Sequence, residues 1–250
     1  SVYAGIRLSG FFVLGPITVY DYNPNVTKSE EAITDSTVYA KNELIKFWKG
    51  PEFRFSSRYK LGMNNSIKLS YNDGLQYIHM MSNSMAISPT DIWKLSDAYI
   101  PPQKGRQIAL GYYQNLSNDV IEASVEVYYK TITDIIDYKP GSQLILNPNL
   151  ERDLLNGVGR AYGIELLVKK KYGKLNGWIG YTYSSSEIKI DGPFVEEKIN
   201  NGAYYPTDYD KPHDFTLVAS YKFTRRISVS SNVTYSSGRP ITLPISKFWF

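Results

Sequence analysis

Apolar and polar residues alternate with a period of two over several long segments of the chain. In residues 52–61, Phe53 and Phe55 fall on one side of an extended backbone, and Arg54 and Arg58 fall on the other. Because successive side chains of a β-strand point to opposite faces, this period predicts strands and not helices. The same alternation recurs in three further segments, which are 121–130, 162–169 and 227–235.

Five other segments keep the same period with glycine or serine interruptions, so we expect nine strands in all. A tenth strand after Ile241 would contain Pro244, which has no amide hydrogen for a neighbouring strand. The five weaker segments are 2–12, 66–72, 107–116, 175–184 and 215–223.

Short polar turns separate these strands at nearly constant spacing. Their centres lie near residues 63, 118, 173 and 225, about 50 to 55 residues apart. Long connections alternate with them, at 14–50, 73–104, 133–160 and 187–212. Strands of about ten residues with short turns at one end and long loops at the other are typical of an outer-membrane β-barrel.

A water-soluble β-sandwich or lipocalin-like barrel would also alternate, with its apolar face turned inward. The strand length, the unequal loops and the many charges on the polar face favour the membrane barrel. Inside the third long connection, Asn147 as cap, Pro148 at the first position and Gly157 as stop predict a short helix.

The alternation also assigns side chains to faces. A charge facing lipid would cost about 2–4 kcal/mol at mid-membrane, so the charged face must line the lumen. There the mixed charges are expected to form cross-strand ion pairs, or to contact a plug or a solute. The expected lumen-facing residues are Arg54, Arg58, Glu122, Glu126 and Glu165. The expected lipid-facing residues are Phe53, Phe55, Val125, Val127, Ile164, Leu166, Val229 and Val233.

The composition excludes several classes of protein. The 250 residues include no run of about 20 apolar residues, which excludes a helical membrane protein. Tyrosine accounts for 22 residues and suits a membrane–water boundary or a binding surface. The net charge of +4 is too small and too scattered to indicate nucleic acid. Without cysteine, and with only His79 and His213 far apart in sequence, we expect no enzyme activity, cofactor or metal site.

The long loops carry the candidate solute contacts. Exposed aromatic rings stack on sugars or peptides, and carboxylates offer hydrogen-bond acceptors or calcium ligands. The competing interpretation is a self-packed loop, in which aspartates accept hydrogen bonds from turn backbone. The candidates are Trp93, Tyr99, Tyr204, Tyr205, Asp208 and Asp210.

Several segments resemble the C-terminal part of the barrel of TonB-dependent outer-membrane receptors of the Bacteroidetes type. Their order and spacing along nearly the whole chain are more specific than any one of them. The segments are Tyr77–Asn83, Pro89–Asp97, Glu122–Lys130, Gly159–Glu165, Gly177–Ser184, Tyr209–Asp214 and Gly238–Pro240.

The resemblance implies an antiparallel barrel of 22 strands around a plug, in the bacterial outer membrane. It also implies energised nutrient uptake through TonB, and it leaves open whether a surface lipoprotein is a further partner. Residues 1–250 would then form a partial barrel domain, without the plug and the N-terminal region. The alternative is a self-contained small outer-membrane barrel that acts as a binding or adhesion module, and a soluble lectin is the third choice. The sequence does not name a solute.

Overall fold

The computed structural model describes residues 1–81, 92–139, 142 and 147–241. Its main feature is one antiparallel sheet whose strands follow one another as β1-β4-β5-β8-β9-β10-β11-β13-β14. These are β1 (Val2–Leu14), β4 (Leu44–Lys60), β5 (Asn65–Gln76), β8 (Gln103–Leu116), β9 (Ile121–Tyr138), β10 (Leu154–Lys170), β11 (Leu175–Lys189), β13 (His213–Lys222) and β14 (Ser228–Ser236). Every pairing between them is antiparallel, and they correspond to the nine expected strands.

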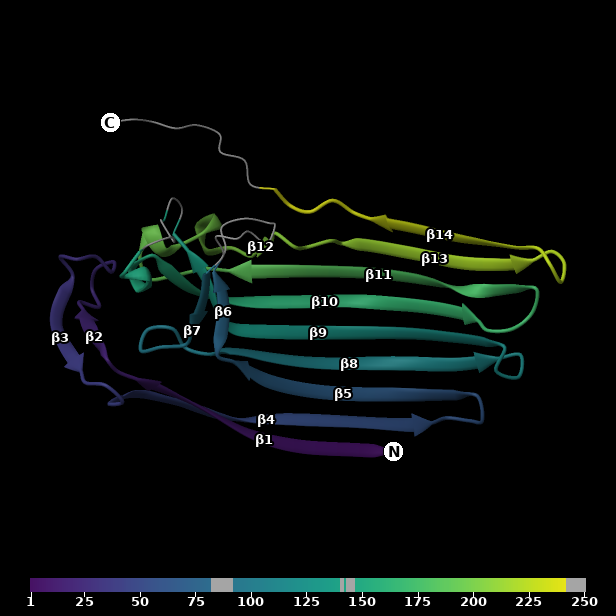
Figure 1. Cartoon of the computed structure of the whole chain (residues 1–250), viewed down its shortest axis with the longest axis horizontal. Helices are drawn as coiled ribbons and strands as arrows, with labels where there is room; N and C mark the ends of the chain where they lie inside the picture. The colour runs from purple at the N-terminus through teal and green to yellow at the C-terminus, as the bar shows by residue number, and fades with distance from the viewer. Residues whose placement is uncertain (82–91, 140–141, 143–146, 242–250) are drawn as a thin grey trace.

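The sheet has a short-turn end and a long-loop end (Figure 1). The expected turns join β4 to β5, β8 to β9, β10 to β11 and β13 to β14. In the second of these, Ser117, Asn118 and Asp119 all have positive φ. Asn and Asp tolerate this conformation best, which explains a tight polar turn without glycine.

Small elements occupy the long connections at the opposite end (Figure 1). Two are hairpins, and the others are short 3₁₀ turns and one two-residue strand that pairs with β11. They are β2 (Ile17–Tyr22) with β3 (Ile33–Tyr39), β6 (Ile78–Met81) with β7 (Ile92–Leu95), η1 (Leu150–Arg152), η2 (Val195–Glu197), η3 (Asn200–Gly202) and β12 (Tyr205–Pro206).

Two details differ from expectation. The helix predicted after Asn147 is only the 3₁₀ turn η1, because Leu154–Gly157 pairs with β9 as the start of β10. Several strands are also much longer than ten residues, and β9 reaches 18. A bulge at Asp134, with φ 59°, interrupts the alternation of β9. The sequence of the outer part of β9 therefore lacks the period of two that predicts a strand. The tenth strand considered after Ile241 lies outside the described residues.

Among the described residues, few side chains are fully buried. The side chains of Val125, Leu166 and Val229 are 40%, 38% and 57% exposed. The buried apolar residues lie mainly at the long-loop end of the sheet, for example Leu150 of η1, Leu155 at the start of β10 and Ile190 after β11. Among the described residues, no helix has the length and apolar content needed to cross a membrane.

Candidate functional site

The register of the sheet places the two expected sets of side chains on opposite faces. Val127 of β9 lies directly opposite Leu110 of β8 and Ile164 of β10. Glu126, one residue earlier and on the other face, lies opposite Glu165. The face of Val127 also carries Phe53, Phe55, Val125, Leu166, Val229 and Val233, and the face of Glu126 carries Arg54, Arg58 and Glu122.

The face of Val127 is an apolar surface, bordered by tyrosines, that the chain itself leaves uncovered. Tyr59 near the short turns is 69% exposed, and Tyr129 toward the loops is 46% exposed. An apolar surface that runs across all the strands is far larger than a soluble monomer normally exposes. It therefore requires an apolar covering.

The opposite, polar face carries charges of both signs, with fewer direct cross-strand ion pairs than expected. Arg7 pairs across the strands with Glu52, whereas Glu122 pairs with Lys171 in a turn. Arg58 donates a hydrogen bond to the Ser66 hydroxyl at 3.0 Å. This face is therefore polar across its width, as the lining of an aqueous lumen would be.

A hollow of about 540 Å³ opens on the polar face, among β1, β4, β5, β8 and β9. Its lining includes Arg7, Glu52, Arg54, Asp73 and Lys130. Glu52 is buried against Arg7, and the Asp73 carboxylate accepts a hydrogen bond from the Phe53 amide. Both acids are thus engaged, whereas Arg54 and Lys130 have no ion pair in the described part of the chain. The hollow is suited to a group with negative charge.

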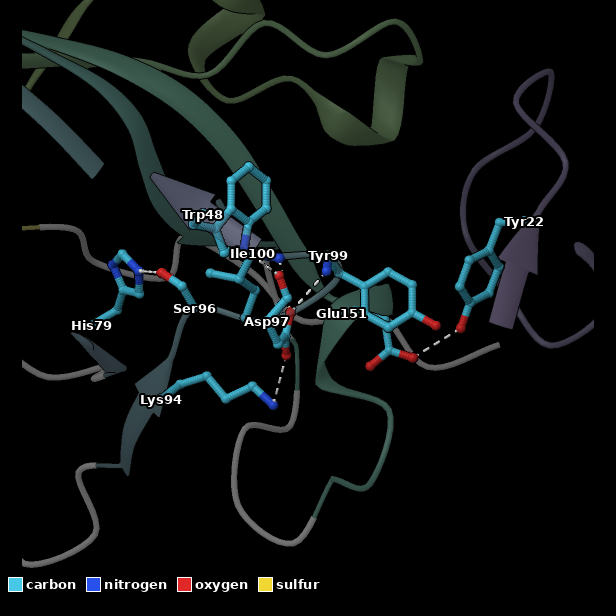
Figure 2. A network of polar contacts seen from close by, with 9 residues as sticks. All are labelled: Tyr22, Trp48, His79, Lys94, Ser96, Asp97, Tyr99, Ile100 and Glu151. Carbon is cyan, nitrogen blue, oxygen red and sulfur yellow. Dashed lines mark hydrogen bonds and ion pairs between the residues drawn. The ribbon is translucent and has the colours of Figure 1, made fainter. Parts of the chain in front are cut away.

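A second polar cluster fixes the loops above the sheet, and Asp97 is its centre (Figure 2). One oxygen of the Asp97 carboxylate accepts the backbone amides of Tyr99 and Ile100, at 2.8 and 2.9 Å. Its other oxygen pairs with the Lys94 ammonium at 3.0 Å. The Asp97 carbonyl accepts the indole N–H of Trp48 at 2.9 Å. Asp97 thereby holds a tight turn against β4.

The same cluster connects three loops that are distant in sequence. The Tyr99 hydroxyl donates to the Tyr20 carbonyl of β2 at 2.9 Å. The Tyr22 hydroxyl donates to Glu151 of η1 at 2.9 Å (Figure 2). It also accepts a hydrogen bond from Arg152 at 3.2 Å. The β2–β3 hairpin is therefore anchored both to the turn at Asp97 and to η1.

A third cluster holds the connection that carries β12. The Tyr205 hydroxyl donates to the Asp137 carboxylate at 2.8 Å. The Asp210 carboxylate accepts the Ser186 amide at 2.8 Å. The Arg160 guanidinium lies 4.0 Å from the centre of the Tyr204 ring. These contacts fasten the loop to β9, β10 and β11.

Burial shifts the pKa values of several side chains in these loops. Burial lowers the pKa of His79 below the ordinary imidazole value. It raises the pKa of Tyr99 to about 12, with nearby carboxylates acting in the same direction. Burial also raises the pKa of Tyr205 and of its partner Asp137. The tyrosines therefore remain hydrogen-bond donors at any physiological pH, and His79 is neutral at pH 7.

The six loop candidates do not converge on one surface patch. Trp93 is 62% exposed on β7, and Asp208 is exposed in its turn. Tyr99, Tyr205 and Asp210 make the internal contacts described above, as the self-packed interpretation anticipates. Tyr204 is partly exposed to solvent, and its ring stacks on the Arg160 guanidinium.

The sequence argument missed the residues that organise the loops. Asp97 was seen only as part of a resembling segment, although an aspartate two residues before an aromatic in a turn is a usable signal. His79 and His213 lie in strands rather than in loops, and His79 is 3% exposed beside Ser96. Within the described ranges, no group of side chains is arranged to hold a metal ion.

Comparison with solved structures identifies the same sheet in two iron-uptake proteins. The ferric-catecholate import receptor Fiu of E. coli K12 superposes with a TM-score of 0.54 at 19% identity, over 95% of this chain and 32% of that one. The FrpB iron transporter of Neisseria meningitidis gives 0.56 at 13% identity, over 92% and 30%. At these identities the likeness shows the fold, and this chain spans about a third of each of those chains.

A search of curated proteins gives no match. The model of one protein family, described as TonB dependent receptor-like, beta-barrel, matches residues 18–244. That match covers most of the chain and agrees with the antiparallel sheet, its short and long connections and its two contrasting faces. The chain belongs to the TonB-dependent receptor β-barrel family.

Proposed function

We propose that this chain forms part of the wall and outer loops of a receptor for energised nutrient uptake. TonB-dependent receptors are non-enzymatic proteins of the outer membrane, and family membership assigns the chain to that membrane. The observation that carries the proposal is the separation of the two sheet faces, apolar around Val127 and charged around Glu126. A wall between lipid and an aqueous lumen needs this separation.

The mechanism at this level is geometric. The wall excludes lipid from the lumen and contacts the hydrocarbon with its apolar face. The loops anchored at Asp97 and Asp137 form a fixed rim, and the polar face lines the path of the solute. The hollow at Arg54 and Lys130 attracts anionic groups that enter this path. No bond-breaking step is needed from any side chain.

The remaining parts of the receptor are proposed from the resemblance. A 22-strand barrel would need additional wall beyond β1 and β14, which end the strand order and are not paired with each other. The plug, the contact with TonB and a surface lipoprotein would come from outside these residues. The segments quoted from the sequence favour a receptor of the Bacteroidetes type. The open strand order favours this arrangement over a self-contained small barrel.

The test uses a pair of neighbouring substitutions in the full-length receptor. Val125→Arg places a charge on the apolar face, at a cost of about 2–4 kcal/mol near mid-membrane, and should abolish assembly into the outer membrane. Glu126→Arg places the same side chain on the polar face and should assemble normally. The readout is heat-modifiable migration of outer-membrane fractions on a detergent gel. Equal tolerance of both substitutions would refute the assignment of faces.

A further inference from the structure

Two glycines form the floor of the hollow on the polar face. Gly74 of β5 lies directly opposite Gly105 of β8, and both line the hollow. Among the described residues, a Cβ added at Gly74 would have only the Glu52 carboxylate within 4 Å, at 3.7 Å, and one at Gly105 only the Lys130 side chain, at 3.9 Å. The backbones therefore do not need glycine here to approach each other. The effect of the pair is to leave the space above it open.

A row of polar side chains borders this floor on the side of the short turns. Adjacent strands are about 4.8 Å apart, so a row across four strands is about 14 Å long. On the other side of the floor, Gln76 lies opposite Gln103. The row, in which each residue lies opposite the next, is Arg54, Asn72, Gln107 and Lys130.

The charges that line the hollow do not cancel. They are four cations and two carboxylates, which leaves a surplus of two positive charges. Arg7 pairs with Glu52, and Arg106 lies opposite Asp73 in the register, so these four charges offset one another.

The two remaining cations lie at the ends of the row. Neither Arg54 nor Lys130 makes an ion pair with another residue that the structure describes. The Lys130 side chain lies beside Gly105, at the edge of the floor. The long side chains of arginine and lysine allow both cations to contact one group that lies between them.

The carboxamides of the hollow are also available. Within the described part of the chain, the side chains of Asn72, Gln103 and Gln107 make no hydrogen bond, whereas Gln76 donates to the Ile78 carbonyl at 2.8 Å. A carboxamide both donates and accepts hydrogen bonds, and a hydroxyl group does the same. None of the lining residues that the structure describes is aromatic, so a ligand here is held by hydrogen bonds and not by ring stacking.

We propose that the hollow binds an anionic sugar, which is a hydroxyl-rich solute that carries an oxyanion. Arg54 and Lys130 bind the oxyanion through charge-assisted hydrogen bonds, and the three free carboxamides bind hydroxyl groups. The sugar ring lies over Gly74 and Gly105. The volume of about 540 Å³ falls within the range of small-molecule sites, about 300–1,000 Å³. This assignment rests on the proposed function, in which the polar face lines the path of the solute.

Binding is measured on the full-length receptor in a neutral detergent, by saturation-transfer difference NMR at about 0.15 M salt. At this ionic strength, exposed charges more than about 8 Å away are largely screened, so the wider field of the polar face contributes little. The probes are glucuronate, glucose 6-phosphate, glucose and acetate. The first two carry a carboxylate and a phosphate on a hydroxylated ring, glucose lacks the charge, and acetate lacks the hydroxyl groups. The wild type should bind at least one anionic sugar at least about tenfold more tightly than glucose and acetate.

Three variants separate the hollow from the rest of the polar face. Arg54→Gln/Lys130→Gln removes the two unpaired cations and should weaken binding of the anionic sugar at least about tenfold. The matched control, Lys60→Gln/Lys68→Gln, removes two cations from the same face nearer the short turns, outside the hollow, and should bind as the wild type does. Gly105→Leu keeps every charge but fills the space above the floor, and it should also weaken binding. All variants are first shown to be assembled by heat-modifiable migration.

The result that binds more tightly, glucuronate or glucose 6-phosphate, identifies the oxyanion as carboxylate or phosphate. The inference would be overturned by a wild type that binds neither anionic sugar or prefers glucose or acetate, by an equal loss in the control, or by unchanged binding in Gly105→Leu. Each of these outcomes leaves the proposed function intact if Val125→Arg still blocks assembly. Normal assembly of Val125→Arg would instead remove the proposed function itself.

Discussion

At the residue scale, the loops depend on a few polar side chains that substitute for missing backbone partners. Asp97 is the clearest case, because one of its oxygens accepts two backbone amides while the other pairs with Lys94. Removing the carboxylate leaves those amides without their acceptor, whereas removing the Lys94 ammonium leaves the turn intact.

Asp97→Ala should therefore destabilise the turn at 97–100 by about 1–3 kcal/mol. Lys94→Ala should cost no more than about 1 kcal/mol, because the ion pair is partly exposed. Hydrogen exchange of the Tyr99 and Ile100 amides in the full-length receptor measures both values. Equal exchange rates in the two variants would contradict the role given to Asp97.

His79 makes the loop end sensitive to acid. Its pKa is lowered in the folded state by burial, so the unfolded loop binds a proton more readily. The stability that this group contributes is fully present above the unfolded value of about 6.5 and is lost as the pH falls below it. The protection factors of the β6–β7 amides, which are exchange rates corrected for the intrinsic rate at each pH, should fall between pH 7.5 and 5.5, and His79→Gln should remove most of that fall. An unchanged pH dependence in His79→Gln would count against this explanation.

At the element scale, strand packing depends on glycine where two backbones come close. Gly177 in β11 has φ 149°, and a methyl group there would collide with the Val218 carbonyl of β13. Gly238, after β14, has open space around it.

Gly177→Ala should lower the yield of assembled barrel at least severalfold, because the β11–β13 pairing must open to admit the methyl group. Gly238→Ala should leave the yield unchanged. Quantifying the heat-modifiable band in outer-membrane fractions distinguishes the two. Normal assembly of Gly177→Ala would show that this contact can relax.

The inner parts of the strands could be predicted from sequence because one face is uniformly apolar there, as at Val125 and Val127. That regularity ends beyond Ile132, where the bulge at Asp134 shifts the register. The helix expected at 147–157 was wrong because Leu154–Gly157 continues the pairing of β10 with β9 beyond this bulge. The loop clusters joined by Asp97 and Tyr205 depend on contacts over 40 or more residues in sequence, which periodicity does not encode.

At the scale of the whole molecule, the account rests on which environment each face of the sheet meets. The apolar face runs from β1 to β14, and the other face carries charged and polar side chains along the same strands. Family membership explains this contrast as the wall of an outer-membrane barrel. The proposed path of the solute depends on that orientation.

The most direct test is a single-cysteine scan of residues 121–130 in β9 of the membrane-embedded, full-length receptor. These 250 residues contain no cysteine, so each introduced thiol in this region reports its own position. With a spin label at each site, oxygen accessibility should peak at the odd-numbered residues, including Val125 and Val127. Accessibility to a water-soluble nickel complex should peak at the even-numbered ones, including Glu122 and Glu126. The opposite phase, or no period of two, would contradict the account.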